Sequence, residues 1–455
     1  MNALDESIKS AVTGERSPAA PPAAPREEIA GSDFGPRSRP DGLGAGGAGP
    51  WADGSALPAG ARSVEGRLLA RLLEYLGNPP LEFILWTGER IAPAGATIVA
   101  RLRVSSRSTL LGILADHQVR FPDAYSEGRL EIEGDLVQLL ETIYRSGRDA
   151  PQPSGLRRLV QGLRRPHINT LYGSRENIHH HYDISNAFYS LWLGETMAYT
   201  CAYYPTPTTT LDEAQTAKMH HVCRKLRLRS GETVVEAGCG WGTLALHMAR
   251  HYGVKVRAFN ISREQVAFAR QRAASLGMSS QVEYVLDDYR NISGRYDAFV
   301  SVGMLEHVGL ENYAELGEVI ARSIGTRGRG FIHSIGRNRP APLQPWIEKR
   351  IFPGAYPPSL AEMMRILEPH DFSVLDVENL RLHYAQTLHH WLALFEAASD
   401  RVREMFDEKF VRMWRMYLAG SIAGFTTGAL QLFQVLFAPR DNDDVSMTRE
   451  HLYPR

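Results

Sequence analysis

The chain has 455 residues, of which 44% are hydrophobic and 22% are charged, and its formal net charge is +0. This length predicts two or three domains, and the balanced charge gives no argument for nucleic acid as a partner. The three cysteines lack the spacing of a disulfide framework or a zinc site, and the N-terminus lacks a secretion signal. We therefore expect a protein of the reducing cytoplasm.

Residues 1–63 are rich in alanine, proline and glycine and predict a disordered tail, because this composition buries too little apolar surface to offset its ordering entropy. Residues 64–147 predict a small α+β domain. Apolar spacing places its helices over 68–76 and 136–144 and its strands over 81–86, 97–104 and 128–133. We recognise no catalytic constellation there, so a lipid-handling role and a purely structural role both stay open.

Residues 148–176 predict a basic linker, in which arginines are interspersed with prolines and glycines. Leu156, Leu159, Val160 and Leu163 add an apolar stripe, which makes a short basic amphipathic helix. Such helices lie on anionic membrane surfaces, so we expect peripheral association with the inner face of the membrane. A solvated linker that is merely basic is the alternative.

Strands and helices alternate over residues 177–455. The strands are expected over 233–236, 254–259, 282–286, 297–302, 330–334, 373–377 and 431–437. The alternation predicts an α/β fold with a doubly wound, seven-stranded, mainly parallel sheet whose last strand is inserted antiparallel. This is the plan of the S-adenosylmethionine (AdoMet) methyltransferases. An aromatic-rich lid precedes the first strand: Tyr182, Phe188, Tyr189, Trp192, Tyr199, Tyr203 and Tyr204.

Residues 416–437 are long and apolar enough to raise the question of a membrane span. Gln431 and Gln434 interrupt the run, and three glycines weaken a helix within it. A span needs about 20 uninterrupted apolar residues, so we expect a buried helix followed by a strand.

The first strand leads into Gly238-Cys239-Gly240-Trp241-Gly242, a turn with GxGxG spacing. Glycines let the backbone turn sharply and let a ligand approach it closely. A dinucleotide fingerprint has its third glycine one residue later and an acidic residue about 20 positions on, whereas the next strand here ends in Asn260. The turn therefore favours AdoMet, and a purely structural turn is the alternative.

Polar residues follow the next two strands at the same edge of the sheet. Asn260 and Gln265 are candidates to bind the ribose hydroxyls of AdoMet. Asp288 is a candidate to accept from the adenine amine, with Tyr289 packing on the ring. Their common position at the carboxyl edge supports this assignment, although each residue type is frequent in loops.

Glu306 and His333 follow neighbouring strands, and Tyr384 follows the sixth strand. We expect them to converge with a cysteine beside apolar walls. The alternatives are a polar loop residue for Glu306, a satisfied core histidine for His333 and a small hydrophobe for Cys201. His179, His180 and His181 are adjacent and diverge, so we expect no metal site.

Several blocks resemble the cyclopropane-fatty-acyl-phospholipid synthase family: His181-Tyr182-Asp183, Tyr199-Thr200-Cys201-Ala202-Tyr203, the GxGxG turn, Glu306-His307-Val308-Gly309 and His333-Ser334-Ile335-Gly336. The resemblance runs from about residue 177 to the C-terminus and, more weakly, over 64–144. It implies a bicarbonate ion at Cys201, Glu306, His333, Ile335 and Tyr384, and an AdoMet site that includes Tyr199, Gly238, Gly240 and Gln265. Family members often carry an arginine near Thr426, so the contacts with the phospholipid headgroup stay open.

The resemblance implies methyl transfer to an alkene of a phospholipid acyl chain, which leaves a carbocation. Water must be excluded, aromatic faces such as Tyr199, Tyr203 and Tyr289 stabilise the cation, and bicarbonate removes a proton. Proton loss from the new methyl group closes a cyclopropane ring, and the alternative fate of the cation is a methylene- or methyl-branched product. A small-molecule O- or N-methyltransferase, a non-catalytic lipid-binding protein and a homodimer also stay open.

Overall fold

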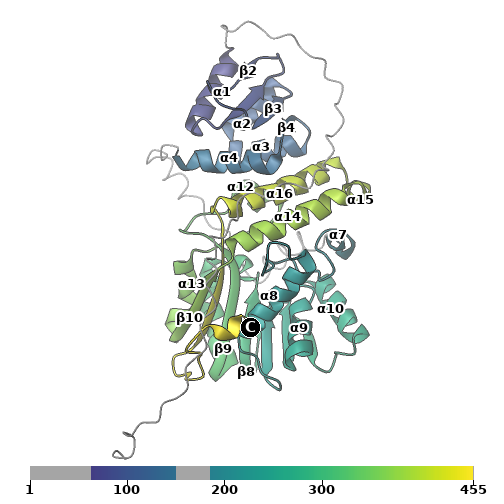
Figure 1. Ribbon diagram of the computed structural model, residues 1–455, viewed down its shortest axis with the longest axis vertical. Coiled ribbons are helices and arrows are strands. Elements are labelled where there is room, and N and C mark those ends of the chain that lie inside the picture. Colours follow the sequence, from purple (N-terminus) through teal and green to yellow (C-terminus); the bar gives the residue numbers. More distant parts are fainter. Residues whose placement is uncertain (1–62, 150–184, 454–455) are drawn as a thin grey trace, which may run out of the picture. The chain divides into compact units, whose positions relative to one another are not determined.

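The computed structural model describes residues 63–149 and 185–453, in two sheets with their helices (Figure 1). The predictions for residues 1–62 and 150–184, which include the tail, nearly all of the basic linker and the three adjacent histidines, lie outside the described residues.

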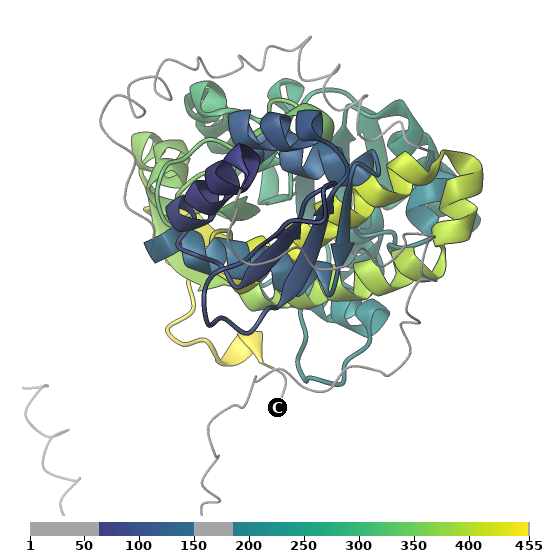
Figure 2. The same cartoon turned by 90° about the horizontal axis from the view of Figure 1, so that it is seen from above.

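The first sheet has the strand order β2-β1-β3-β4, with β1 parallel to β3 and antiparallel to β2 (Figure 2). Its elements are α1 (Val64–Tyr75), β1 (Leu81–Ile84), β2 (Arg90–Ile91), β3 (Ala100–Val104), α2 (Arg107–Ala115), α3 (His117–Ser126), β4 (Leu130–Glu133) and α4 (Leu136–Asp149). In β3 buried and exposed residues alternate, so one face of this sheet is covered.

The second sheet has seven strands in the described part of the chain, in the order β10-β11-β9-β8-β5-β6-β7. The strands are β5 (Thr233–Ala237), β6 (Lys255–Asn260), β7 (Val282–Leu286), β8 (Tyr296–Val302), β9 (Ile324–Gly336), β10 (Phe372–Asn379) and β11 (Gln431–Pro439). Only β11 runs against its neighbours, β9 and β10, among these pairings. The predicted doubly wound sheet with an inserted last strand is confirmed, and the strand order reverses at β5, where such sheets bind ligands.

The helices used in the argument below lie in the part of the chain that contains this sheet. They are α7 (Asn186–Ser190), α8 (Leu211–Lys225), α9 (Thr243–Tyr252), α10 (Arg263–Ser275), α11 (Tyr313–Ser323), α12 (Pro345–Arg350), α13 (Leu360–Leu367), α14 (Arg381–Ala397), α15 (Ser399–Met405) and α16 (Glu408–Thr426), with the 3₁₀ turns η1 (Tyr289–Asn291) and η2 (Leu305–His307). Residues of α8, α9 and α10 form one core with one face of the sheet, and residues of α11 and α13 form another core with the opposite face.

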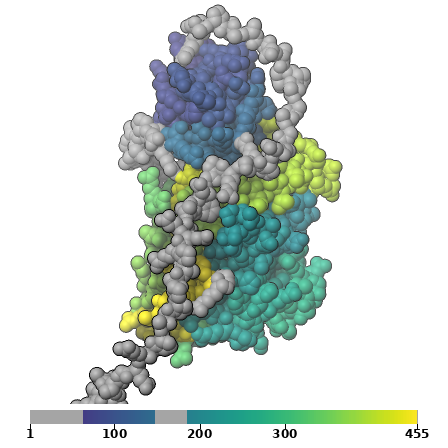
Figure 3. Space-filling view, in the orientation of Figure 1, coloured from purple at the N-terminus to yellow at the C-terminus, as the bar shows by residue number. Residues whose placement is uncertain are grey.

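Residues 416–437 lie within α16 and β11, as predicted. No helix among the described residues is long and apolar enough to cross a membrane. Helix α16 packs against α14, α3 and α4 (Figures 1 and 3), and these contacts explain its apolar composition.

Strand β9 is longer than the prediction for 330–334. Its first half contains Gly325 and Gly328, which read as a loop, but Ile324 pairs with Tyr296 of β8. A register shift between Tyr296 and Ala298 accommodates the irregular segment.

Candidate active site

The glycine turn after β5 leaves open space at one of its three glycines. All three have positive φ: +81° at Gly238, +53° at Gly240 and +80° at Gly242. A Cβ on Gly238 would lie 2.7 Å from Met304 Cβ, and a Cβ on Gly242 would lie 2.5 Å from the Tyr284 ring, so packing explains these two. A Cβ on Gly240 would meet no atom of the described residues within 4 Å. This space fits the expectation that a ligand approaches the backbone here.

Asn260 holds the glycine turn from the end of β6. Its Nδ2 donates to the carbonyl of Gly240 (3.1 Å) and to Gln265 Oε1 (2.8 Å). Both side chains are buried. The two predicted ribose-binding residues are therefore joined to each other and to the turn, and their contact with a ribose stays a prediction.

Asp288 already has a cationic partner. It caps η1 by accepting from Arg290 N (3.0 Å), and its carboxylate pairs with Arg290 Nη1 at 3.2 Å. The same guanidinium lies 4.9 Å from the centroid of the Tyr289 ring. The adenine contacts assigned to Asp288 and Tyr289 stay predictions. The contact of Arg290 with both residues was not recognised from the sequence.

Side chains of helix α8 form hydrogen bonds with the aromatic segment that precedes it. Gln215 Nε2 donates to the carbonyls of Ala198 (3.2 Å) and Thr200 (2.9 Å), and Lys218 Nζ donates to Thr200 Oγ1 (2.8 Å). Both α8 side chains are buried. These bonds fix the backbone on either side of Tyr199, a predicted AdoMet-binding residue.

Tyr199 itself lies among aromatic rings. Its hydroxyl is 2.8 Å from the Tyr417 hydroxyl of α16, and its ring centroid lies 5.2 Å from Trp192 and 5.4 Å from Trp391. The side chains at this end of the sheet therefore form an apolar, largely dehydrated wall.

Cys201 and Tyr384 meet at one carbonyl. Cys201 Sγ lies 3.9 Å from the carbonyl oxygen of Leu380, which also accepts from Tyr384 N at 3.1 Å. Thr387, one turn further along α14, accepts from Ala202 N at 3.0 Å. Burial raises the pKa of the Cys201 thiol, so it is neutral at physiological pH. Cys201 is therefore a neutral thiol rather than a thiolate.

Glu306 reaches from η2 to the end of β9. Its Oε1 accepts from Ile335 N at 2.6 Å, and its Oε2 is buried without a hydrogen-bond partner among the described residues. Burial raises the pKa of the Glu306 carboxyl to about 7, partly opposed by backbone hydrogen bonds. The group is thus a carboxyl that exchanges a proton near neutral pH, with one oxygen fixed and the other oxygen unpaired.

His333 is also half satisfied. Its Nδ1 lies 3.1 Å from Gln434 Nε2 of β11, while its buried Nε2 has no hydrogen-bond partner in the described part of the chain. Burial, together with the positive charges of Lys218 and Lys225, holds the pKa of His333 well below its usual value, so the ring is neutral.

A chain of contacts through Leu432 and Leu380 connects four of the five predicted residues. Ile335, held by Glu306, pairs with Leu432 of β11, and the carbonyl of Leu432 accepts from Leu380 N at 2.9 Å. Leu380 is the residue that Cys201 and Tyr384 share. His333 lies two positions before Ile335 on β9, so the two side chains share a face of the sheet. Unpartnered atoms of Glu306 and His333 at this edge fit a small bound anion that can share a proton.

One aromatic residue is arranged differently from the expectation. The Tyr203 ring stacks on His221 (4.3 Å between centroids) and on His383 (4.8 Å). Two parallel rings at these distances cannot share one face, so neither face of Tyr203 is free to stabilise a cation on a substrate. Tyr289 likewise lies under Arg290.

Sequence reasoning missed a row of buried polar residues on α8. Lys218, His221 and Lys225 lie three and four positions apart and face Glu236, His333 and Glu378 on the sheet. The detectable signal was a set of ionisable residues at helical spacing among Met219, Val222 and Cys223, which belong to the core.

The position of Thr426, where an arginine is usual in the resembled family, has a guanidinium beside it. Arg381 Nη1 donates to the carbonyls of Phe425 (2.7 Å) and Thr426 (2.9 Å). Thus α14 supplies the positive charge at the end of α16.

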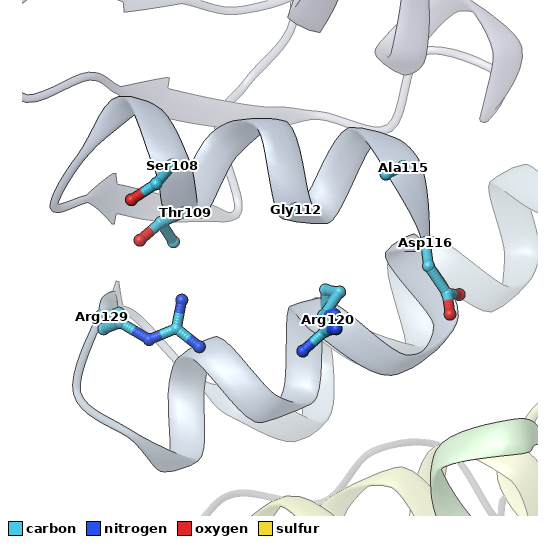
Figure 4. A pocket seen from close by; sticks show the side chains of 7 residues that line it. All are labelled: Ser108, Thr109, Gly112, Ala115, Asp116, Arg120 and Arg129. Atoms are coloured by element: carbon cyan, nitrogen blue, oxygen red, sulfur yellow. The ribbon is translucent and has the colours of Figure 1, made fainter.

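A cavity of about 380 Å³ lies away from these residues, between α2 and α3 (Figure 4). It is lined by Ser108, Thr109, Gly112, Ala115, Asp116, Arg120 and Arg129. Arg129 already pairs with Glu127. This cavity has no residue in common with the site at the carboxyl edge of the second sheet.

Comparisons with known proteins identify the family. The model of the mycolic acid cyclopropane synthetase family matches residues 170–435. A probable fatty acid methyltransferase of Pseudomonas putida is 35% identical over 392 residues, which are 82% of this chain and 96% of that protein. The cyclopropane-fatty-acyl-phospholipid synthase of Escherichia coli K12 is 33% identical over 373 residues, with coverage of 80% and 96%.

A solved structure agrees with this family. The mycolic acid cyclopropane synthase CmaA1, complexed with SAH and CTAB, is 28% identical, with a TM-score of 0.55 and coverage of 58% of this chain and 97% of that chain. The described sheet has the strand order expected for its fold. The chain belongs to the mycolic acid cyclopropane synthetase family and is an AdoMet-dependent methyltransferase.

Proposed function

We propose that the enzyme transfers the methyl carbon of AdoMet to the double bond of an unsaturated phospholipid acyl chain and closes a cyclopropane ring. The observation that carries the proposal is the Glu306 carboxyl, which is buried among apolar residues with one oxygen fixed by Ile335 and one oxygen unpaired. A proton acceptor in apolar surroundings suits a carbocation on a lipid tail, which hydration would quench.

AdoMet supplies an electrophilic methyl group when bound. In this proposal Gly238, Gly240 and Gly242 form the turn that lies against it, and Asn260 keeps the turn in shape through the Gly240 carbonyl. Tyr199 and Gln265 complete the site, with Asp288 and Tyr289 at the adenine end. The open space beside Gly240 supports this arrangement.

Bicarbonate is the proposed base. Glu306 and His333 each present a buried polar atom without a protein partner, and Cys201, Ile335 and Tyr384 line the same edge of the sheet. When bound, the anion supplies a proton acceptor. Glu306, which exchanges a proton near neutral pH, would receive that proton, and neutral His333 would donate to the anion from Nε2 in the tautomer protonated there.

The aromatic wall has the task of excluding water. Trp192, Trp391 and Trp414 are fully buried, and Tyr199 joins them at the edge of the site. Because Tyr203 and Tyr289 have occupied faces, we assign stabilisation of the cation mainly to the bound anion and to the exclusion of water.

The lipid substrate requires contact with a membrane. We propose peripheral binding to the inner face of an anionic membrane. The lipid substrates named for the relatives support a lipid for this enzyme, as does the family model. Arg381 at the end of α16 is a candidate for the phosphate of the headgroup.

A methylene- or methyl-branched fatty acid is the second candidate product. The Pseudomonas relative is named a probable fatty acid methyltransferase, and the same carboxyl would serve either outcome. Proton loss from a chain carbon next to the cation gives a methyl-branched alkene. A 1,2-hydride shift from the methylated carbon, followed by proton loss from the methyl group, gives a methylene branch.

The test is transfer of a ¹³C-labelled methyl group to vesicles of unsaturated phospholipid, followed by NMR of the extracted acids. High-field ring protons on the labelled carbon are the expected result, and a labelled exocyclic methylene or a labelled methyl group on an alkene carbon would establish the branched product instead. The Glu306→Gln variant is the matched control for background methylation. If the wild type transfers no label to any unsaturated lipid, the proposed function is wrong.

A further inference from the structure

A buried lysine lies beside the proposed anion. Lys218 is 2% exposed and is carried by α8, between core residues of the sheet face that holds His333. Burying an ammonium group is costly unless an opposite charge compensates it. We therefore expect a compensating negative charge near Lys218.

The fixed groups around Lys218 do not fully balance it. Its hydrogen bond goes to a neutral hydroxyl, Thr200 Oγ1, at 2.8 Å. The carboxyl that acts on it is Glu236 of β5, and burial raises the pKa of Glu236 to about 8, so that this carboxyl is largely protonated at neutral pH. Burial lowers the pKa of Lys218 only to about 8, so the ammonium keeps its charge.

The second buried lysine of the same helix shows the contrast. Lys225, two turns later, lies 2.7 Å from Glu378 Oε2 and 3.3 Å from Asp376 Oδ2. Its charge is thus paired by carboxylates within the protein. Lys218 has no such pair among the ion pairs of the described residues.

The charge of Lys218 acts on two residues of the proposed anion site. Thr200, which Lys218 holds, directly precedes Cys201, and the charge of Lys218 acts on both Cys201 and His333. His333 also has the buried, unpartnered Nε2. A neutral imidazole and a neutral thiol therefore both lie within the electrostatic reach of this cation.

We propose that Lys218 is a positioning residue that supplies the countercharge for the anion in the active site and holds the Thr200–Cys201 segment against it. The inference rests on the function proposed above. The ionisable groups facing Lys218 are Cys201 of the aromatic segment, Glu236 of β5, His333 of β9 and His247 of α9. A bound anion would supply the negative charge that these groups lack.

Gln215 provides the matched control. It lies one turn before Lys218 on α8 and holds the same segment through the carbonyls of Ala198 and Thr200, but it carries no charge. Gln215→Leu loosens the segment and leaves the countercharge in place. Lys218→Met removes the charge, and Lys218→Arg keeps it.

Binding of ¹³C-labelled sodium bicarbonate at constant ionic strength, followed by ¹³C NMR, is the direct measurement. We expect Lys218→Met to weaken bicarbonate binding by about tenfold or more, the loss typical of a charge-assisted hydrogen bond. Lys218→Arg should recover most of the affinity, and Gln215→Leu should keep it. Lys218→Gln replaces the methionine variant should that variant not fold.

Unchanged bicarbonate affinity in a folded, uncharged Lys218 variant would overturn the inference, as would an equal loss in Gln215→Leu. A wild type that methylates vesicle lipids but binds no bicarbonate also overturns it and leaves methyl transfer intact. A wild type that does neither overturns both proposals.

Discussion

At the scale of single residues, Glu306 links two neighbouring strands. It follows β8, and its carboxylate accepts a hydrogen bond from the backbone of β9. The bond orients the carboxyl, and burial moves its pKa to about 7. The sequence placed Glu306 correctly at a strand end, but the Ile335 N–H that holds it lies 29 residues away and follows only from the sheet register.

Glu306→Gln should leave the structure intact and remove the proton acceptor. The amide oxygen still accepts from Ile335, so AdoMet affinity should be unchanged while turnover falls by about 10²- to 10⁴-fold. Steady-state kinetics and AdoMet titration check both parts. Glu362→Gln, which changes a buried carboxyl of α13 held by Ser359 and Tyr356, is the control and should retain turnover.

The rate should rise with pH through about 7 if ionised Glu306 is the active form. The sign for stability is opposite: the folded carboxyl keeps its proton up to about pH 7, whereas the unfolded one releases it near 4.5, so its contribution to stability is lost as pH rises across this interval. Rates measured at a fixed concentration of bicarbonate ion test the first part. A pH profile identical in Glu306→Gln would remove this residue from the titration.

Gly240→Ala should weaken AdoMet binding more than it destabilises the fold. The added methyl meets no protein atom but enters the space proposed for the ligand. Gly277→Ala is the matched control, since Gly277 also has positive φ (+68°) and open space but follows α10 outside the turn. Both variants should lose about 1 kcal/mol of stability from backbone strain, and only Gly240→Ala should lose AdoMet affinity in calorimetry.

At the scale of elements, α8 supports the site without containing any residue predicted from the sequence. Its capping box, Thr210 with Glu213, starts the helix and is recognisable in the sequence. Its buried lysines and histidine were not assigned, because their partners Glu378 and Glu236 come from strands that only the sheet order brings under the helix. Sequence spacing indicates a face of a helix and leaves its partners undetermined.

The contact between α3 and α12 gives a prediction for this scale. Asp123 is 5% exposed and accepts from Trp346 Nε1 (3.0 Å) and Arg350 Nη2 (3.0 Å). Asp123→Ala leaves the indole donor unpaired, so the free energy of unfolding should fall by about 1–3 kcal/mol.

Asp400→Ala is the control for that measurement. It removes a carboxylate of α15 that is 93% exposed and pairs with Arg403. Solvent screens such pairs, and chemical denaturation should detect no change. Equal losses in the two variants would show that burial does not decide the strength of the Asp123 contact.

At the scale of the molecule, the fold could be predicted because each strand is a short apolar run followed by a turn. All seven strands of the second sheet lie where the periodicity places them, and the inserted strand β11 is antiparallel as expected. The sequence could not provide the local side-chain pairings. Arg290 forms an ion pair with Asp288, and the rings of His221 and His383 stack on Tyr203. These depend on side-chain directions that no periodic pattern specifies.

The position of β11 also has a consequence for synthesis on the ribosome. Strand β11 is the last strand to emerge, yet it lies between β9 and β10, and its Leu432 carbonyl fixes Leu380 beside Cys201. Until residue 439 has left the exit tunnel, β9 carries an open edge that invites pairing with other nascent chains. The predicted site is therefore completed only after β11 has been synthesised, and a ribosome stalled before this strand would hold a chain in which the site is incomplete.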